Sequence, residues 1–195
     1  MQVRKNMPAD SSRAAVKAKR ALVLIDFFNQ FDFPQAHLLV GSAWQAAQAT
    51  HRLKQQFLRR EEIVIYANDN YGRWNLSFSD LIEDCQQLPG LPGKIARLMS
   101  PGPSDFRIIK PRHSGFFGTP LDLILREHRV REIIVTGIAT DICVQFTVVD
   151  AYMHGYRCWV PGNCTAAETE FLKQQALQHM SKTMKCDVSD AESES

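Results

Sequence analysis

Short apolar runs rich in Val, Ile and Leu recur along this 195-residue chain, with longer helical patterns between them. The strongest runs are Ala21–Ile25, Ile63–Tyr66 and Ile133–Thr136, and weaker ones are Phe106–Ile109 and Cys158–Val160. A continuous apolar run of this length is typical of a strand that is buried on both faces of a parallel sheet. The alternation therefore predicts an α/β fold, a three-layer α/β/α open sheet of five or six mainly parallel strands.

Capping residues and helical periodicity mark the segments between these strands. The predicted helices run from Ser42 to about Arg59, from Thr119-Pro120 to about His128, from Thr140 to near Gly155, and from Thr165, with Glu168 in a capping box, to about Met184. We interpret Leu88–Gly93, which is rich in proline and glycine, as a loop, and Lys185–Val188 as a short edge strand.

The length suits one compact domain, which we expect at residues 20–186 between a basic tail (1–19) and an acidic tail (187–195), both solvated. A net charge of +2 gives no reason to expect a nucleic acid partner, and no apolar run approaches the roughly 20 residues that span a bilayer. The five cysteines are odd in number and form no C-x-x-C pair, which favours free thiols and a cytoplasmic location.

Ligands of open parallel sheets bind at the carboxyl ends of the strands, and two ionisable residues lie there. Asp26 directly follows the first predicted strand, where it is either a general base or an ordinary turn-forming residue. Lys110 follows Phe106–Ile109 and is either a snorkelling surface residue or a cation that holds a nearby carboxylate and thiol ionised.

Cys143 gives the sharpest signal, because it falls in the first turn of a helix that begins directly after a buried strand. The partial positive charge of a helix N-terminus lowers the pKa of a thiol, and the unpaired N–H groups there can hold an oxyanion. This position favours a nucleophile over a buried structural cysteine. The other four cysteines lack the context, and we interpret them as structural.

Several side chains near the predicted strand ends are candidates for substrate binding. Phe31 and Trp74 can wall a small planar substrate, and Asn70 can hydrogen-bond its carbonyl or amide group; ordinary loop packing is the alternative. Arg73 and Arg112 are candidates for binding a carboxylate, although surface solvation is the favoured interpretation of Arg112. The sequence contains none of the motifs G-x-G-x-x-G, G-x-x-x-x-G-K-[ST], G-x-S-x-G or H-E-x-x-H, which argues against nucleotide-dependent and serine-hydrolase chemistry.

Asp26, Lys110 and the segment G-I-A-T-D-I-C-V at Gly137–Val144 together resemble the isochorismatase-like cysteine hydrolase superfamily, over the stretch from about Arg20 to Thr183. The superfamily includes nicotinamidases, carbamoylsarcosine amidases and isochorismatases. The resemblance implies a catalytic triad of Asp26, Lys110 and Cys143, a cis peptide before Ala139, an oxyanion hole formed by the backbone N–H groups of Ala139 and Cys143, and a homodimer or homotetramer.

Two departures narrow what the resemblance implies. Nicotinamidases place metal-binding histidines after the second strand, where this chain has Asn68-Asp69-Asn70-Tyr71, so we expect no metal and no cofactor. Isochorismatases that cleave a vinyl ether generally lack the cysteine, so its presence favours the amidase branch. The expected activity is hydrolysis of a small amide or ureide C–N bond through a Cys143 thioester. Vinyl-ether or ester hydrolysis, and a non-catalytic or redox-sensing thiol protein, are the alternatives.

Overall fold

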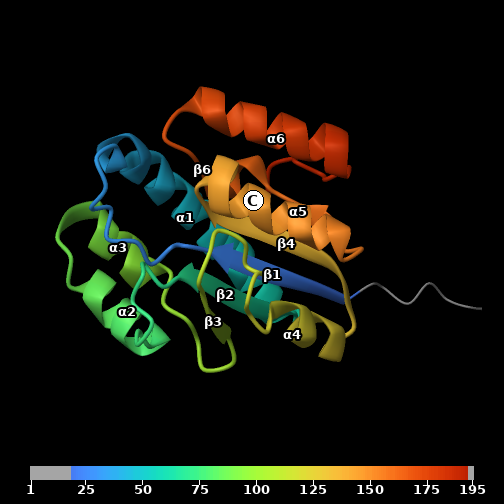
Figure 1. The fold of residues 1–195 in the computed structure, drawn as a ribbon, viewed down its shortest axis with the longest axis horizontal. Coiled ribbons are helices and arrows are strands. Elements are labelled where there is room, and N and C mark those ends of the chain that lie inside the picture. The colour runs from blue at the N-terminus through green and yellow to red at the C-terminus, as the bar shows by residue number, and fades with distance from the viewer. Residues whose placement is uncertain (1–18, 193–195) are drawn as a thin grey trace, which may run out of the picture.

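The computed structural model describes residues 19–192, which form a central sheet with helices on both faces (Figure 1). The strands are β1 (Lys19–Ile25), β2 (Ile63–Asp69), β3 (Phe106–Lys110), β4 (Val130–Ile138), β5 (Arg157–Trp159) and β6 (Thr165–Ala166). The helices are α1 (Ala36–Arg59), α2 (Phe78–Gln86), α3 (Gly90–Leu98), α4 (Leu121–Glu127), η1 (Thr140–Val144), α5 (Gln145–Met153), η2 (Gly162–Cys164) and α6 (Glu170–Met184).

The sheet has the order β3-β2-β1-β4-β5, with β6 pairing further along β4, and all of these strand pairs are parallel. This confirms the fold predicted from the alternation of strands and helices. Since β1 lies in the middle, its carboxyl end has neighbours on both sides, from β2 and from β4.

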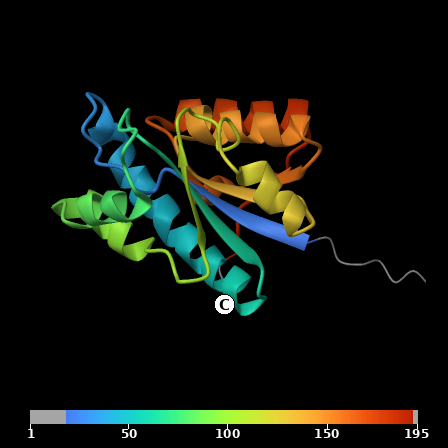
Figure 2. The same cartoon turned by 60° about the horizontal axis from the view of Figure 1, so that its bottom comes forward.

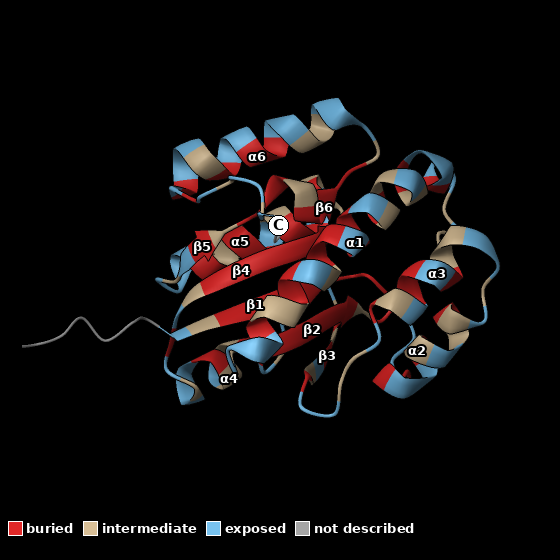
Figure 3. Cartoon of the chain, turned by 180° about the vertical axis from the view of Figure 1, so that it is seen from behind, coloured by how far each residue is buried: buried red, intermediate tan, exposed pale blue. Residues whose placement is uncertain are grey.

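The apolar run of β1 supplies both hydrophobic cores because successive side chains of a strand point to opposite faces. Leu22 and Leu24 pack in the core under α1, α2 and α3, whereas Ala21, Val23 and Ile25 pack in the core under α4, α5 and α6. Figure 2 shows the two helical layers on either side of the sheet, and Figure 3 shows the strands as mostly buried.

Two helix starts differ from the prediction. The first helix begins at Ala36 rather than Ser42, whose hydroxyl instead donates to the Leu39 carbonyl inside the helix. The last helix begins at Glu170, where the Thr169 side chain accepts a hydrogen bond from the Leu172 N–H group. Thr165, which we predicted as its cap, belongs to β6 and pairs with Gly137 of β4, because the open edge of β4 takes up this stretch of backbone as a strand.

The loop predicted over Leu88–Gly93 is wrong in its second half, which forms the first turn of α3. A proline is tolerated in the first turn of a helix, since the N–H group it lacks has no partner there, so Pro92 does not prevent the helix. The expected edge strand at Lys185–Val188 reduces to a single parallel bridge between Trp159 and Asp187.

The beginning of the segment expected to be a solvated acidic tail is hydrogen-bonded to the domain. The Val160 N–H group donates to the Asp187 carbonyl at 2.8 Å, and the Asn163 N–H group donates to the Asp190 carboxylate at 2.8 Å. Residues 1–18 of the basic tail and 193–195 lie outside the described part of the chain. Within residues 19–192, no helix is long and apolar enough to cross a bilayer.

Candidate active site

Four neighbouring strands deliver polar side chains to one edge of the sheet. Asp26 follows β1, Asp69 ends β2, Lys110 ends β3, and Cys143 lies in η1 just after β4. Because β3 lies two strands from β1, Lys110 uses its long side chain to cross the end of β2 and reach Asp26. The sheet order therefore brings together four residues that are far apart in the sequence.

Lys110 lies at the centre of this cluster and its side chain is completely buried. Its ammonium group is 2.8 Å from the Asp26 carboxylate, 3.3 Å from the Asp69 carboxylate and 3.5 Å from the Cys143 sulfur, and it also donates to the Arg112 carbonyl. Burial alone would lower the pKa of Lys110, but Asp26, Cys143 and Asp69 outweigh burial and raise that pKa. A buried ammonium with these partners excludes the snorkelling alternative.

Asp26 is buried as well, and both of its carboxylate oxygens have partners. Oδ2 pairs with Lys110, and Oδ1 accepts a hydrogen bond of 2.7 Å from the Asp69 N–H group. Burial raises the pKa of Asp26 above that of an ordinary aspartate, and the charge of Lys110 only partly opposes this effect. Asp26 and the Cys143 thiol also shift each other's pKa, and both contact the Lys110 ammonium group.

Cys143 lies in a single π-helical turn, closed by a hydrogen bond from the Val144 N–H group to the Ala139 carbonyl. We expected the helix N-terminus to lower the pKa of this thiol. Instead burial, and then the negative charge of Asp26, raise the pKa of Cys143 above its ordinary value. The raised pKa favours the neutral thiol, which shares the Lys110 ammonium group with the Asp26 carboxylate.

The peptide bond between Ile138 and Ala139 is cis, as the resemblance implied. Just before it, Gly137 has a φ of 124°, and a Cβ atom at this position would lie 2.0 Å from the Ile25 carbonyl oxygen. Only glycine permits this close approach of β4 to the end of β1. The oxyanion hole at the N–H groups of Ala139 and Cys143 stays a prediction.

A pocket of about 340 Å³ adjoins the cluster. Its lining consists of Asp69, Asn70, Tyr71, Gly72, Trp74, Pro111, Arg112 and His113. Two predicted substrate-binding residues, Asn70 and Trp74, thus meet in one pocket, where Trp74 is 79% exposed. Phe31 is not part of this lining; it packs against the core under α1 to α3.

The sequence analysis assigned no role to His113, which the structure places beside Cys143. Its Nδ1 atom lies 3.7 Å from the Cys143 sulfur, and its ring packs against Phe146 of α5 at 5.6 Å between centroids. The available signal was its place three residues after Lys110, in a loop that leaves the same edge of the sheet.

The residues that follow β2 do not fit a metal site of the nicotinamidase kind. The Asn68 amide is hydrogen-bonded to the backbone of Phe28, and Asp69 is paired with Lys110. Across residues 19–192, no three His, Cys, Asp or Glu side chains are grouped so as to hold a metal ion. No catalytic step is therefore assigned to a metal.

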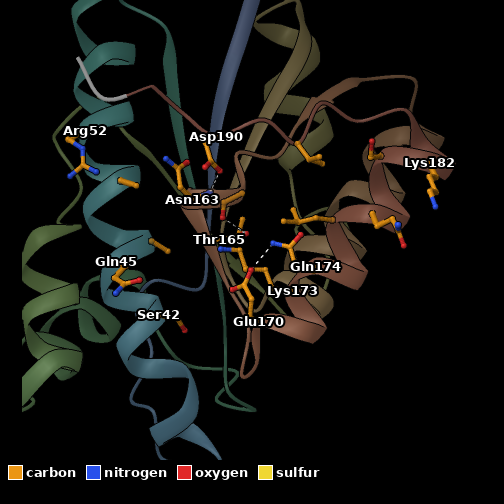
Figure 4. A pocket seen from close by; sticks show the side chains of 17 residues that line it. Ser42, Gln45, Arg52, Asn163, Thr165, Glu170, Lys173, Gln174, Lys182 and Asp190 are labelled. Carbon is orange, nitrogen blue, oxygen red and sulfur yellow. Dashed lines mark hydrogen bonds between the residues drawn. The ribbon is translucent and has the colours of Figure 1, made fainter. Parts of the chain in front are cut away.

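A larger cavity of about 750 Å³ lies between α1 and α6, and neither Asp26, Lys110 nor Cys143 lines it (Figure 4). Its walls carry mainly amide, hydroxyl and charged side chains, among them Arg52, Lys173, Glu170 and Asp190. None of its lining residues is a cysteine or a histidine. Size alone does not identify the candidate site, and the smaller pocket is the one connected to the cluster, through Asp69 beside Lys110 and His113 beside Cys143.

Comparison with known proteins agrees with this geometry. Residues 20–193 match the family model of the isochorismatase domain. The uncharacterized isochorismatase family protein YaaI of Bacillus subtilis is 34% identical over 90% of this chain and 96% of its own. The chain therefore belongs to the isochorismatase family of hydrolases.

Two solved structures extend the comparison. The nicotinamidase of Staphylococcus aureus superposes with a TM-score of 0.69 at 26% identity, over 88% of this chain and 98% of its own. The N-carbamoylsarcosine amidase of Thermoplasma acidophilum has a TM-score of 0.67 at 24% identity, over 91% of this chain and 99% of its own. This similarity supports the fold.

Proposed function

We propose that this protein is a cysteine amidohydrolase that cleaves the C–N bond of a small carboxamide or ureide through a thioester on Cys143. The observation that carries the proposal is the buried contact of a carboxylate, an ammonium and a thiol at the edge of the sheet where ligands bind. The similarity to a nicotinamidase supports the amide class, since that protein is named for amide hydrolysis.

In the proposed mechanism Asp26 accepts the proton of the Cys143 thiol while Lys110 stabilises both negative groups. The sulfur attacks the carbonyl carbon, and the resulting oxyanion is held by the backbone N–H groups of Ala139 and Cys143. Asp26 then returns its proton to the departing ammonia or amine. A thioester on Cys143 remains, which water hydrolyses to release the acid.

Asn70 and Trp74 are the proposed substrate contacts. The Asn70 Oδ1 atom accepts a hydrogen bond from the Gly72 N–H group, which fixes the amide at the wall of the pocket. The exposed indole of Trp74 offers an apolar face at the same pocket. Phe31 contributes at most indirectly, by supporting the loop that follows β1.

The test is a panel of small carboxamides, ureides, esters and isochorismate, with ammonia or acid release as the readout. Wild-type protein should release ammonia from at least one carboxamide or ureide, and Cys143→Ala should reduce that rate on the order of 10⁵-fold or more, as loss of a nucleophile does. Cys85→Ala removes a buried cysteine of α2 outside the site and serves as the matched control.

Mass spectrometry of the quenched reaction completes the design. An acyl adduct on Cys143 supports the thioester route. Turnover of isochorismate or an ester but of no amide would favour the other hydrolase reactions on this fold. A Cys143→Ala variant with full activity, or a reactive thiol with no product from any substrate, would refute the proposal.

A further inference from the structure

We infer that His113 is a catalytic residue on the pocket side of Cys143, where it serves as the general base for hydrolysis of the thioester. The inference rests on the proposed function and adds a residue to it. It is carried by three observations: the contact of His113 with the nucleophilic sulfur, its place in the pocket lining, and the anchoring of its loop to the helix that follows Cys143.

The first step concerns which group can reach an incoming water. Asp26 is almost fully buried, with one oxygen on Lys110 and the other on the Asp69 N–H group. Neither Asp26 nor Cys143 is part of the pocket lining. His113 is exposed, lines the pocket and has its Nδ1 atom 3.7 Å from the sulfur, so the imidazole joins the pocket to the sulfur and is placed to meet a water that comes from the pocket.

The second step concerns how firmly the imidazole is held, because a general base acts only at a fixed distance. The residues on both sides of His113 are anchored. The Arg112 carbonyl accepts a hydrogen bond from Lys110, and the Ser114 hydroxyl donates to the Asp150 carboxylate of α5 at 2.5 Å. The ring itself rests on Phe146.

A further bond fastens the same loop to the same helix. The Gly115 N–H group donates to the Thr147 hydroxyl at 2.9 Å, and that hydroxyl donates to the Cys143 carbonyl at 2.7 Å. The loop and the nucleophile are thus fixed to one another through α5. An exposed surface histidine with no function requires no such set of contacts.

The proposed step balances as follows. The Nδ1 atom of His113 takes a proton from water as the water oxygen bonds to the thioester carbon. The carbon–sulfur bond then breaks, the electron pair goes to the sulfur of Cys143, and the same proton passes from Nδ1 to that sulfur. The products are the carboxylic acid and the free thiol, and no other reactant is needed.

The experiment uses p-nitrophenyl acetate, which separates formation of the acetyl-enzyme, seen as a burst of nitrophenolate, from its hydrolysis, seen as the steady-state rate. For His113→Gln we expect an unchanged burst rate, a steady-state rate that is about 10²- to 10⁴-fold lower, and accumulation of acetyl-Cys143 in the mass spectrum. His179→Gln, an exposed histidine on α6, is the control and should behave as wild type.

A second variant separates proton transfer from a structural effect. In His113→Ala, free imidazole added to the buffer should accelerate the loss of acetyl-Cys143 in the mass spectrum but not the burst, once the imidazole-catalysed hydrolysis of the ester without protein has been subtracted. A His113→Gln protein that hydrolyses its acetyl-enzyme at the wild-type rate, or one whose burst and steady state fall equally, would overturn the inference while leaving Cys143 as the nucleophile. Absence of a burst and of acetyl-Cys143 in the wild type would instead refute the proposed function itself.

Discussion

The ionisable residues of the site depend on one another for their protonation states. A buried carboxylate, ammonium and thiol each carry a large desolvation cost, and the contacts among Asp26, Lys110 and Cys143 compensate it. The pKa values of Asp26 and Cys143 are both raised, because burial outweighs the stabilising contacts that each group makes. Catalysis by this arrangement requires a carboxylate that is ionised and a thiol that is not.

The raised pKa of Asp26 predicts where the burst rate declines at acidic pH. The base acts only when ionised, so the burst rate with p-nitrophenyl acetate should be present above the pKa of Asp26 and should be lost as the pH falls through it. Because burial raises that pKa, the decline should lie at higher pH than the value of about 3.9 for an ordinary aspartate. Circular dichroism at each pH checks that the fold persists. A decline at or below about 3.9 would contradict the assignment.

At the scale of single elements, short polar contacts decide where helices begin. Ser77 and Asp80 form a capping box at the start of α2, and Thr169 caps α6. A capping hydroxyl replaces one of the hydrogen bonds that the first turn cannot make internally. The exact cap matters here because α6 supplies Leu177 and Met180 to the core above β4.

Removal of the cap tests this corrected start of α6. Thr169→Ala should lower the free energy of unfolding by about 1 kcal/mol, as the loss of a threonine cap does. Thr183→Ala, an exposed position within the same helix, should change stability by less than about 0.5 kcal/mol. Urea unfolding followed by circular dichroism measures both. Equal effects of the two variants would show that Thr169 is not the cap.

At the scale of the whole molecule, a second buried ion pair ties one helical layer to the sheet. Lys54 of α1 lies 2.7 Å from Asp105, which precedes β3, and also donates to the Tyr66 hydroxyl of β2 at 2.9 Å. Both charged side chains are almost completely buried. The pair is remote from Cys143 in the sheet, since it sits before β3 rather than at its carboxyl end.

Breaking this pair should destabilise the entire fold. Lys54→Met leaves the Asp105 carboxylate buried without its cation, so we expect a loss of about 3–5 kcal/mol in the free energy of unfolding. Arg73→Met breaks the exposed pair with Asp84 and should cost less than about 1 kcal/mol. Urea unfolding compares the two. If Lys54→Met fails to fold, Lys54→Met combined with Asp105→Leu should recover stability, and a double variant no better than the single one would contradict the argument.

The strand pattern, the layer architecture and the position of Cys143 were predictable because they follow from local regularities: uninterrupted apolar runs, the capping rules, and a cysteine at a strand-to-helix junction. The starts of α1 and α6 were less predictable. Several Ser and Thr residues satisfy the rule for a helix N-cap. Only the pairing of Thr165 with Gly137 in the sheet excludes Thr165 as the cap of α6.

The sequence singles out Asp26, Lys110 and Cys143 as candidates, because each follows a recognisable strand. Their mutual contacts follow only from the fold. In the strand order β3-β2-β1-β4, the Lys110 side chain passes Asp69 at the end of β2 and reaches Asp26 after β1. The loop after β3 is hydrogen-bonded to α5, which places His113 beside the Cys143 sulfur. Burial then reverses the expected pKa shift of Cys143, because desolvation depends on packing from all sides and no local pattern records it.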